Sequence, residues 1–214
     1  MSAPLFIGHM LADKNVQAQI MARCQTAYIA DDPASIADDL GLLDLPDGTR
    51  TRVWMLHAAD TVLLDDHGQV ALITRLHNPG RGKLALPGGL LDATENRPEL
   101  SLTAALREAI EETGISSNRL SEAHITQLGH RRTIRPFDIR QAWNNLPGTP
   151  VCQGELFTVS TLGFRARLAG NLRDIPFNAG DDAGSVEILY AHAVLQENLA
   201  VPDHLELIHA ALNM

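Results

Sequence analysis

The chain of 214 residues is long enough for one large domain, or for a core domain with a substantial extension. Its hydrophobic content of 45% is ordinary for a globular protein, and its net charge of −9 argues against non-specific nucleic-acid binding. Cys24 and Cys152 are too few for a disulfide framework or a zinc site. Because the sequence shows neither a signal peptide nor an apolar run of ~18–20 residues, we expect a cytoplasmic protein without membrane contact.

Residues 1–50 are predicted to form a mainly helical extension that serves packing or dimerisation. Asp13 is placed to cap a helix whose apolar residues recur at helical spacing up to Cys24. A second short helix is predicted over Ala34–Leu43. No pattern in this extension indicates chemistry.

From residue 51 the pattern becomes that of strands. Val53–Leu64 is rich in apolar and β-branched residues, and Val70–Arg75 follows after a turn signal, which predicts a hairpin. The chain then passes through a loop with two cations and two glycines into Pro87-Gly88-Gly89. Glycines let the backbone approach a ligand such as a phosphate closely. A flexible hairpin end explains the glycines alone slightly better, but the acidic helix that follows favours the ligand.

The segment from Arg107 to Ile115 concentrates three carboxylates and one arginine. On a helix, which turns by about 100° per residue, Glu108, Glu111 and Glu112 fall within one third of the circumference. No lysine occurs after Lys83 to relieve their repulsion. Mg²⁺ takes oxygen ligands from carboxylates and phosphates, so this face predicts a divalent-cation site.

The remaining elements are simpler. We predict strands over Ala123–Gln127, Glu155–Leu168 and Val186–Tyr190, and a terminal helix that begins at Asp203 and continues through Leu212. His204, at the start of that helix, is interpreted as a packing or capping residue and not as a catalytic one.

Residues Gly89–Ile115 resemble the Nudix box, whose pattern is glycine, five residues, glutamate, seven residues, then Arg-Glu-apolar-x-Glu-Glu-x-Gly-apolar. Arg107 to Ile115 match the second half at every defined position, and Gly89 and Glu95 match the first half. Eleven residues separate Glu95 from Arg107 where the pattern has seven. Four extra residues are about one helical turn, so we predict a helix that begins one turn early, near Pro98.

The insertion leaves the role of Glu95 open, because two assignments of the first half are available. Glu99 would restore the spacing of seven residues, but Ala93 would then occupy the glycine position. The carboxylate face lies after the insertion and keeps its internal geometry in either case.

Flanking segments resemble Nudix domains that hydrolyse ADP-ribose, especially those fused to nicotinamide mononucleotide adenylyltransferases. The similar segments are Asn78–Gly89, Phe137-Asp138 with Arg140, and Asp203–Ile208. This resemblance implies an α/β (α+β) fold over residues 51–214, namely the Nudix α/β/α sandwich with a mixed β-sheet. It also implies a nucleotide substrate and a homodimer.

The resemblance implies Mg²⁺-dependent hydrolysis of ADP-ribose to AMP and ribose 5-phosphate, with Mn²⁺ as an alternative ion. The implied metal ligands are Glu108, Glu111, Glu112 and the carbonyl of Gly88, and Arg107 would hold Glu111 in place. The phosphates or terminal ribose would contact Arg75, Arg81, Gly88 and Gly89. The general base stays open among Glu112, Glu155, Asp138, Asp181 and Asp182.

Three alternatives compete with this hypothesis. The same chemistry acts in related proteins on sugar nucleotides, dinucleotides or oxidised nucleoside triphosphates. A non-catalytic ADP-ribose sensor is disfavoured, because the segment after Tyr190 is short for a DNA-binding domain and all three box glutamates are present. An acidic helix without a metal function is the third alternative.

Overall fold

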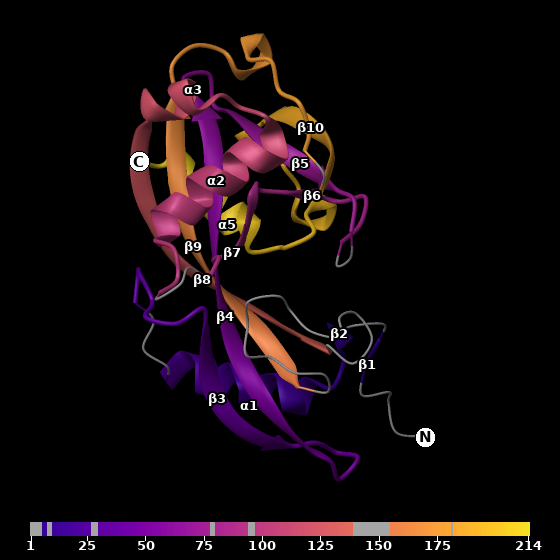
Figure 1. Cartoon of the computed structure of the whole chain (residues 1–214). Helices are drawn as coiled ribbons and strands as arrows, with labels where there is room; N and C mark the ends of the chain where they lie inside the picture. The colour runs from indigo at the N-terminus through magenta and orange to yellow at the C-terminus, as the bar shows by residue number, and fades with distance from the viewer. Residues whose placement is uncertain are drawn as a thin grey trace. The chain divides into compact units, whose positions relative to one another are not determined.

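The computed structural model describes residues 6–7, 10–26, 30–77, 80–93, 97–138, 155–180 and 182–214. Two compact units divide the chain (Figure 1). Unit 1 comprises Met1–His57, Leu90–Leu100 and Arg132–Thr161, and unit 2 comprises Ala58–Gly89, Ser101–Arg131 and Leu162–Met214. Across the described ranges, no helix is both long enough and apolar enough to span a membrane.

The strands hydrogen-bond in the order β1-β2-β8-β9-β4-β5-β10, with β3 and β7 paired to β4 and β6 paired to β5. Their bounds are β1 Phe6–Ile7, β2 Met10–Leu11, β3 Ala37–Asp44, β4 Arg50–Asp65, β5 Gln69–Arg75, β6 Leu84–Ala85, β7 Gly88–Leu90, β8 His124–Asp138, β9 Leu156–Leu168 and β10 Ala183–Tyr190. The β4–β5 hairpin is antiparallel, as predicted, and Leu84 forms a parallel bridge with Leu199.

Unit 2 has helices on both faces of its strands. Helix α2 (Ser101–Thr113) covers one face, where Ala109 packs with Leu63 and Ala71. Helix α5 (His204–Leu212) covers the other face, where its apolar residues pack with Val62 and Leu64. Successive residues of a strand point to opposite sides, so β4 serves both layers at once. Figure 1 shows α2 and α5 on opposite sides of these strands, which is the predicted α/β/α sandwich.

Unit 1 is built around helix α1 (Lys14–Thr26), which buries Val16, Ile20 and Cys24 against β3 and β4 residues. The predicted first helix is therefore confirmed. The predicted second helix over Ala34–Leu43 is wrong, because this segment forms β3, antiparallel to β4. A register shift between Asp39 and Leu42 and the positive φ of 85° at Gly41 interrupt the alternation that would have revealed a strand.

Helix α2 begins at Ser101, so the predicted early start near Pro98 is also wrong. Pro98 instead forms an antiparallel bridge with Ala93. The helix ends as expected, since Gly114 follows it with a φ of 65°. The short helix α3 spans Ser117–Ser121, and 3-10 helices span Leu172–Asp174, Ala191–Ala193 and Gln196–Asn198.

Candidate active site

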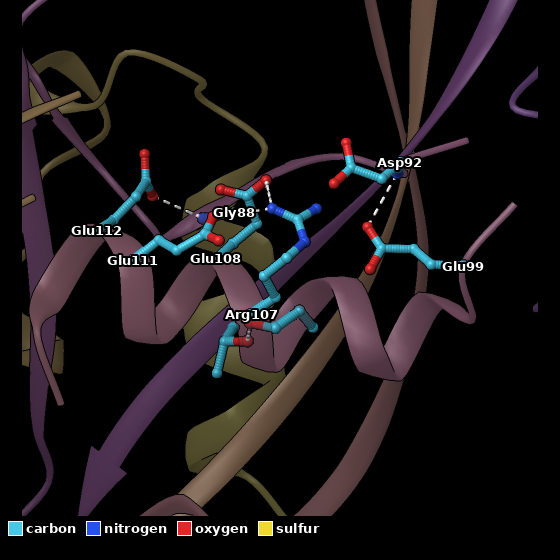
Figure 2. Close-up of polar contacts among 9 residues, drawn as sticks. Gly88, Asp92, Glu99, Arg107, Glu108, Glu111 and Glu112 are labelled. Atoms are coloured by element: carbon cyan, nitrogen blue, oxygen red, sulfur yellow. Dashed lines mark hydrogen bonds and ion pairs between the residues drawn. The ribbon is translucent and has the colours of Figure 1, made fainter. Parts of the chain in front are cut away.

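The acidic face of α2 is organised by Arg107. One guanidinium nitrogen, Nη1, donates to Glu108 Oε1 at 2.8 Å and to Glu111 Oε2 at 2.9 Å (Figure 2). The side chain of Glu108 is 15% exposed, whereas that of Glu111 is 57% exposed. Arg107 therefore joins an inner carboxylate to an outer one.

The glycine turn lies directly against this face. The N–H of Gly88 donates to Glu112 Oε2 at 2.9 Å, as Figure 2 shows. A Cβ placed on Gly89 would overlap the carboxylate of Glu108. Strand β7 and helix α2 thus meet through two glycine–glutamate contacts. These contacts place the glycine turn beside the carboxylate face of the helix.

Glu112 carries the clearest electrostatic signal of the site. The pKa of this carboxyl is raised from 4.5 to about 8, mainly by burial and to a smaller extent by the neighbouring carboxylates of Glu108 and Asp60. The Gly88 N–H and the charge of Arg75 lower the pKa of Glu112 but do not offset the burial. Without a cation, the carboxyl of Glu112 therefore keeps its proton at neutral pH.

Asp60 and His204 belong to this environment, although the sequence did not point to them. Asp60, in the apolar strand β4, is 6% exposed, and its Oδ2 lies 3.0 Å from His204 Nε2. A Cβ on Gly88 would overlap Asp60 Oδ1. The available signal was a carboxylate in the middle of the apolar run Val53–Leu64, where Asp60 is the one acidic residue. His204 caps no helix with its side chain but is buried, in agreement with its predicted packing role.

The predicted substrate contacts lie on two segments of unit 2. Arg75 ends β5, close enough for its charge to act on Glu112. Arg81 is exposed on the glycine-containing loop that precedes β6.

The remaining candidates separate into different surroundings. Glu155, in unit 1, accepts a hydrogen bond of 2.6 Å from Trp54 Nε1, and the exposed Asp182 lies 3.4 Å from His77 Nε2. Glu99 accepts from the amide of Asp92 at 2.9 Å (Figure 2). Glu95, Asp181, Arg140 and the side chain of Asp138 lie outside the described residues.

The donor set suits a hard divalent cation in its chemistry. Glu108, Glu111 and Glu112 present carboxyl oxygens, the type of ligand that Mg²⁺ prefers, on one face of α2. As the described side chains lie, however, no three His, Cys, Asp or Glu groups converge closely enough to hold a metal ion. Arg107 holds one oxygen of Glu108 and one of Glu111, so a cation bound here would share these carboxylates with Arg107.

Comparison with known proteins identifies the region that contains this site. A family model described as the NUDIX domain matches residues 55–145. The NUDIX domain of Shewanella oneidensis NrtR, complexed with ADP ribose, is 24% identical over 78% of this chain and 91% of its own, with a TM-score of 0.51. No curated protein sequence matches the chain.

Two further solved structures give lower TM-scores. A bifunctional NMN adenylyltransferase/ADP ribose pyrophosphatase from Francisella tularensis is 18% identical over 94% of this chain and 46% of its own, with a TM-score of 0.48. The Nudix hydrolase RenU from M. smegmatis is 20% identical over 81% of this chain and 96% of its own, also with a TM-score of 0.48. The NUDIX family model thus matches residues 55–145, and the likeness to the NrtR domain shows that the two proteins share a fold.

Proposed function

We propose that the NUDIX domain of this chain is a pyrophosphohydrolase that depends on a divalent cation and cleaves ADP-ribose to AMP and ribose 5-phosphate. The observation that supports the proposal best is the contact of Gly88 with Glu112 and of Gly89 with Glu108. This contact places a turn suited to phosphate against a face suited to a cation. Water adds across the P–O–P bridge, so each product keeps one phosphate.

The residues of α2 would have distinct tasks in this reaction. Glu108, Glu111, Glu112 and the Gly88 carbonyl would hold Mg²⁺ or Mn²⁺, which neutralises pyrophosphate charge and lowers the pKa of water when bound. Arg107 keeps Glu108 and Glu111 in register along the helix through its two hydrogen bonds. The proton of the attacking water passes to a carboxylate, and Glu112, Glu155, Asp138, Asp181 and Asp182 are the candidates.

Substrate charge also has counterparts outside α2. Arg75 is near enough to Glu112 to influence its ionisation, so it can face a phosphate held at the same place. Arg81, exposed on the preceding loop, is assigned to the second phosphate or the terminal ribose. ADP-ribose is favoured among nucleotide substrates by the flanking segments noted above and by the ligand of the NrtR domain.

A second function is favoured by one observation. The NrtR domain, whose fold this chain shares, was solved with ADP ribose bound. Binding without hydrolysis would make this chain a sensor of the same ligand. The retention of Glu108, Glu111 and Glu112 on one buried-to-exposed helix face favours the enzyme, because a sensor has no need of three clustered carboxylates.

A phosphate-release panel separates these functions. ADP-ribose, NADH, a nucleotide sugar, a diadenosine polyphosphate and a nucleoside triphosphate are each incubated with the full chain, with and without Mg²⁺. We expect Mg²⁺-dependent turnover that is fastest on ADP-ribose, and a loss of at least about a hundredfold in Glu111→Gln because a metal ligand is removed.

The controls decide between the alternatives. Glu197→Gln changes an exposed glutamate of a 3-10 helix and should keep full activity. Saturable ADP-ribose binding without turnover of any substrate would establish the sensor. Faster turnover of another member of the panel would keep the enzyme and replace its substrate.

A further inference from the structure

A buried chain of hydrogen bonds connects three separate parts of unit 2 beside the glycine turn. His204 Nε2 lies 3.0 Å from Asp60 Oδ2, and the N–H of Leu86 donates to His204 Nδ1 at 3.0 Å. These hydrogen bonds therefore join β4, α5 and the segment that leads into Gly88. Asp60 and His204 are each 6% exposed, so little water competes for these bonds.

The partners fix the protonation of the imidazole. A backbone N–H can only donate, so Nδ1 of His204 must accept from Leu86. The ring proton then resides on Nε2 and is donated to Asp60 Oδ2. His204 thus holds one oxygen of Asp60 and orients the carboxylate without needing a second proton.

The other oxygen of Asp60 faces the glycine turn. Asp60 Oδ1 lies where a Cβ of Gly88 would be, so it touches the α-carbon of that glycine. The same glycine donates its N–H to Glu112, and the N–H of Thr61, next to Asp60, donates to the carbonyl of Pro87 at 2.9 Å. Thr61 Oγ1 also donates to the carbonyl of Ala105 in α2 at 2.9 Å. The side chain of Asp60 is therefore held by His204, and the backbone next to it is fixed at Thr61 against both the glycine turn and the acidic helix.

We propose that Asp60, oriented by His204, is a positioning residue of the cation site. It supplies a fourth carboxylate from β4, and its fixed charge beside Gly88 increases the attraction of the site for a divalent cation. Its contact with Gly88 also keeps the turn in place against Glu112. This inference rests on the proposed function only in that both need a cation at α2.

Binding of Mn²⁺ to the full chain, measured by isothermal titration calorimetry without substrate, tests the role of Asp60. We expect Asp60→Asn to weaken Mn²⁺ binding by about 10- to 100-fold, the range typical of groups that orient metal ligands. The matched control is Asp65→Asn. Asp65 is a buried carboxylate of the same strand, but it accepts from the backbone of His67, Gln69 and Leu172, away from the glycine turn.

Asp65→Asn should lower the free energy of unfolding and leave Mn²⁺ affinity unchanged. If Asp60 had only a structural role, Asp60→Asn would likewise lower the free energy of unfolding without changing Mn²⁺ affinity. Wild-type Mn²⁺ affinity in Asp60→Asn would therefore overturn the inference.

Two substitutions of His204 provide a rescue test that does not depend on Asp60→Asn folding. Glutamine can accept from Leu86 through its amide oxygen and donate to Asp60 through its amide nitrogen, whereas phenylalanine can do neither. We expect His204→Gln to keep Mn²⁺ affinity within about threefold of the wild type. His204→Phe should lose as much Mn²⁺ affinity as Asp60→Asn does. Equal affinities in the two variants would contradict the proposed orientation.

Nuclear magnetic resonance of the imidazole nitrogens gives an independent check, with the proton expected on Nε2 of His204 in the wild-type chain. A proton on Nδ1 would refute the hydrogen-bond chain. The outcomes also separate this inference from the proposed function. If the wild-type chain binds Mn²⁺ but hydrolyses no substrate, only the proposed function is refuted. If it binds no Mn²⁺, both the proposed function and the role of Asp60 are refuted.

Discussion

Gly88 and Gly89 are adjacent in the chain, yet a side chain would meet different obstacles at each. At Gly88 a Cβ would overlap Asp60 Oδ1 and lie 2.6 Å from the carbonyl oxygen of Ala59 and 2.8 Å from Asp60 Cα. At Gly89 its nearest neighbours all belong to the side chain of Glu108. Backbone cannot move aside cheaply, whereas the end of a side chain can rotate.

This difference predicts opposite phenotypes for two alanine substitutions. Gly88→Ala should lower the free energy of unfolding by several kcal/mol, roughly the cost of a severe core overlap. Gly89→Ala should fold with a loss below about 1 kcal/mol but displace Glu108 and weaken Mn²⁺ binding. Denaturant unfolding measures the stability of both variants, and isothermal titration calorimetry measures their Mn²⁺ affinity. Unchanged Mn²⁺ affinity in Gly89→Ala would count against Glu108 as a ligand.

The ionisation of the Glu112 carboxyl makes the stability of the fold depend on pH. Its pKa of about 8 in the folded chain exceeds the ordinary value of 4.5 because burial disfavours the charge. Between these two values the folded state binds more protons than the unfolded state. Stability must then fall as pH rises through that window.

In the presence of a chelator, we expect the free energy of unfolding of the wild-type chain to decline from about pH 5 to about pH 8 relative to Glu112→Gln. Glutamine has no proton to lose, so the variant lacks this contribution. Denaturant unfolding at several pH values measures the difference between the two proteins. A difference that stays constant with pH would contradict the buried, protonated carboxyl.

At the scale of elements, the end of α2 is held by the segment before β10. The N–H of Asn178 donates to the carbonyl of Thr113 at 2.9 Å, and the N–H of Gly180 donates to that of Glu112 at 3.2 Å. Gly114 continues the helix into a left-handed conformation, and a Cβ there would lie 2.6 Å from the carbonyl oxygen of Asn178. The helix end that carries Glu111 and Glu112 is therefore clamped by a distant segment.

Gly114→Ala should destabilise the fold by more than about 1 kcal/mol, because it adds this overlap to the strain of a positive φ. Gly170→Ala is the matched control, since Gly170 has a φ of 91° and nothing within 4 Å of a Cβ. We expect a smaller loss for Gly170→Ala in denaturant unfolding. Equal losses would show that the contact with Asn178 contributes nothing.

The elements also show where sequence patterns were sufficient. Strand β4, the β4–β5 hairpin, α1 and α5 follow from apolar spacing, which burial in one core enforces. Strand β3 was missed because its bulge at Gly41 breaks the alternation, and its pairing with β4 is a tertiary contact. The early start of α2 was wrong because Pro98 is held by a bridge to Ala93 and not by helical hydrogen bonds.

For the whole molecule, the motif located the acidic face, but only the fold revealed what surrounds it. Glu108, Glu111 and Glu112 could be placed on one side of a helix from their spacing alone. Asp60 and His204 could not be connected to them, because β4 and α5 approach the glycine turn only through tertiary packing. The match of the NUDIX model to residues 55–145 includes Asp60 and the acidic helix but not His204.

The most direct measurement is the rate of AMP release from ADP-ribose by the wild-type chain and by Glu112→Gln, each with Mg²⁺ and with a chelator. We predict turnover by the wild-type chain only with Mg²⁺, and a rate lower by at least about a hundredfold in the folded variant under the same conditions. Turnover that is independent of Mg²⁺, or equal in the two proteins, would contradict the assignment of helix α2 as a hydrolytic metal site.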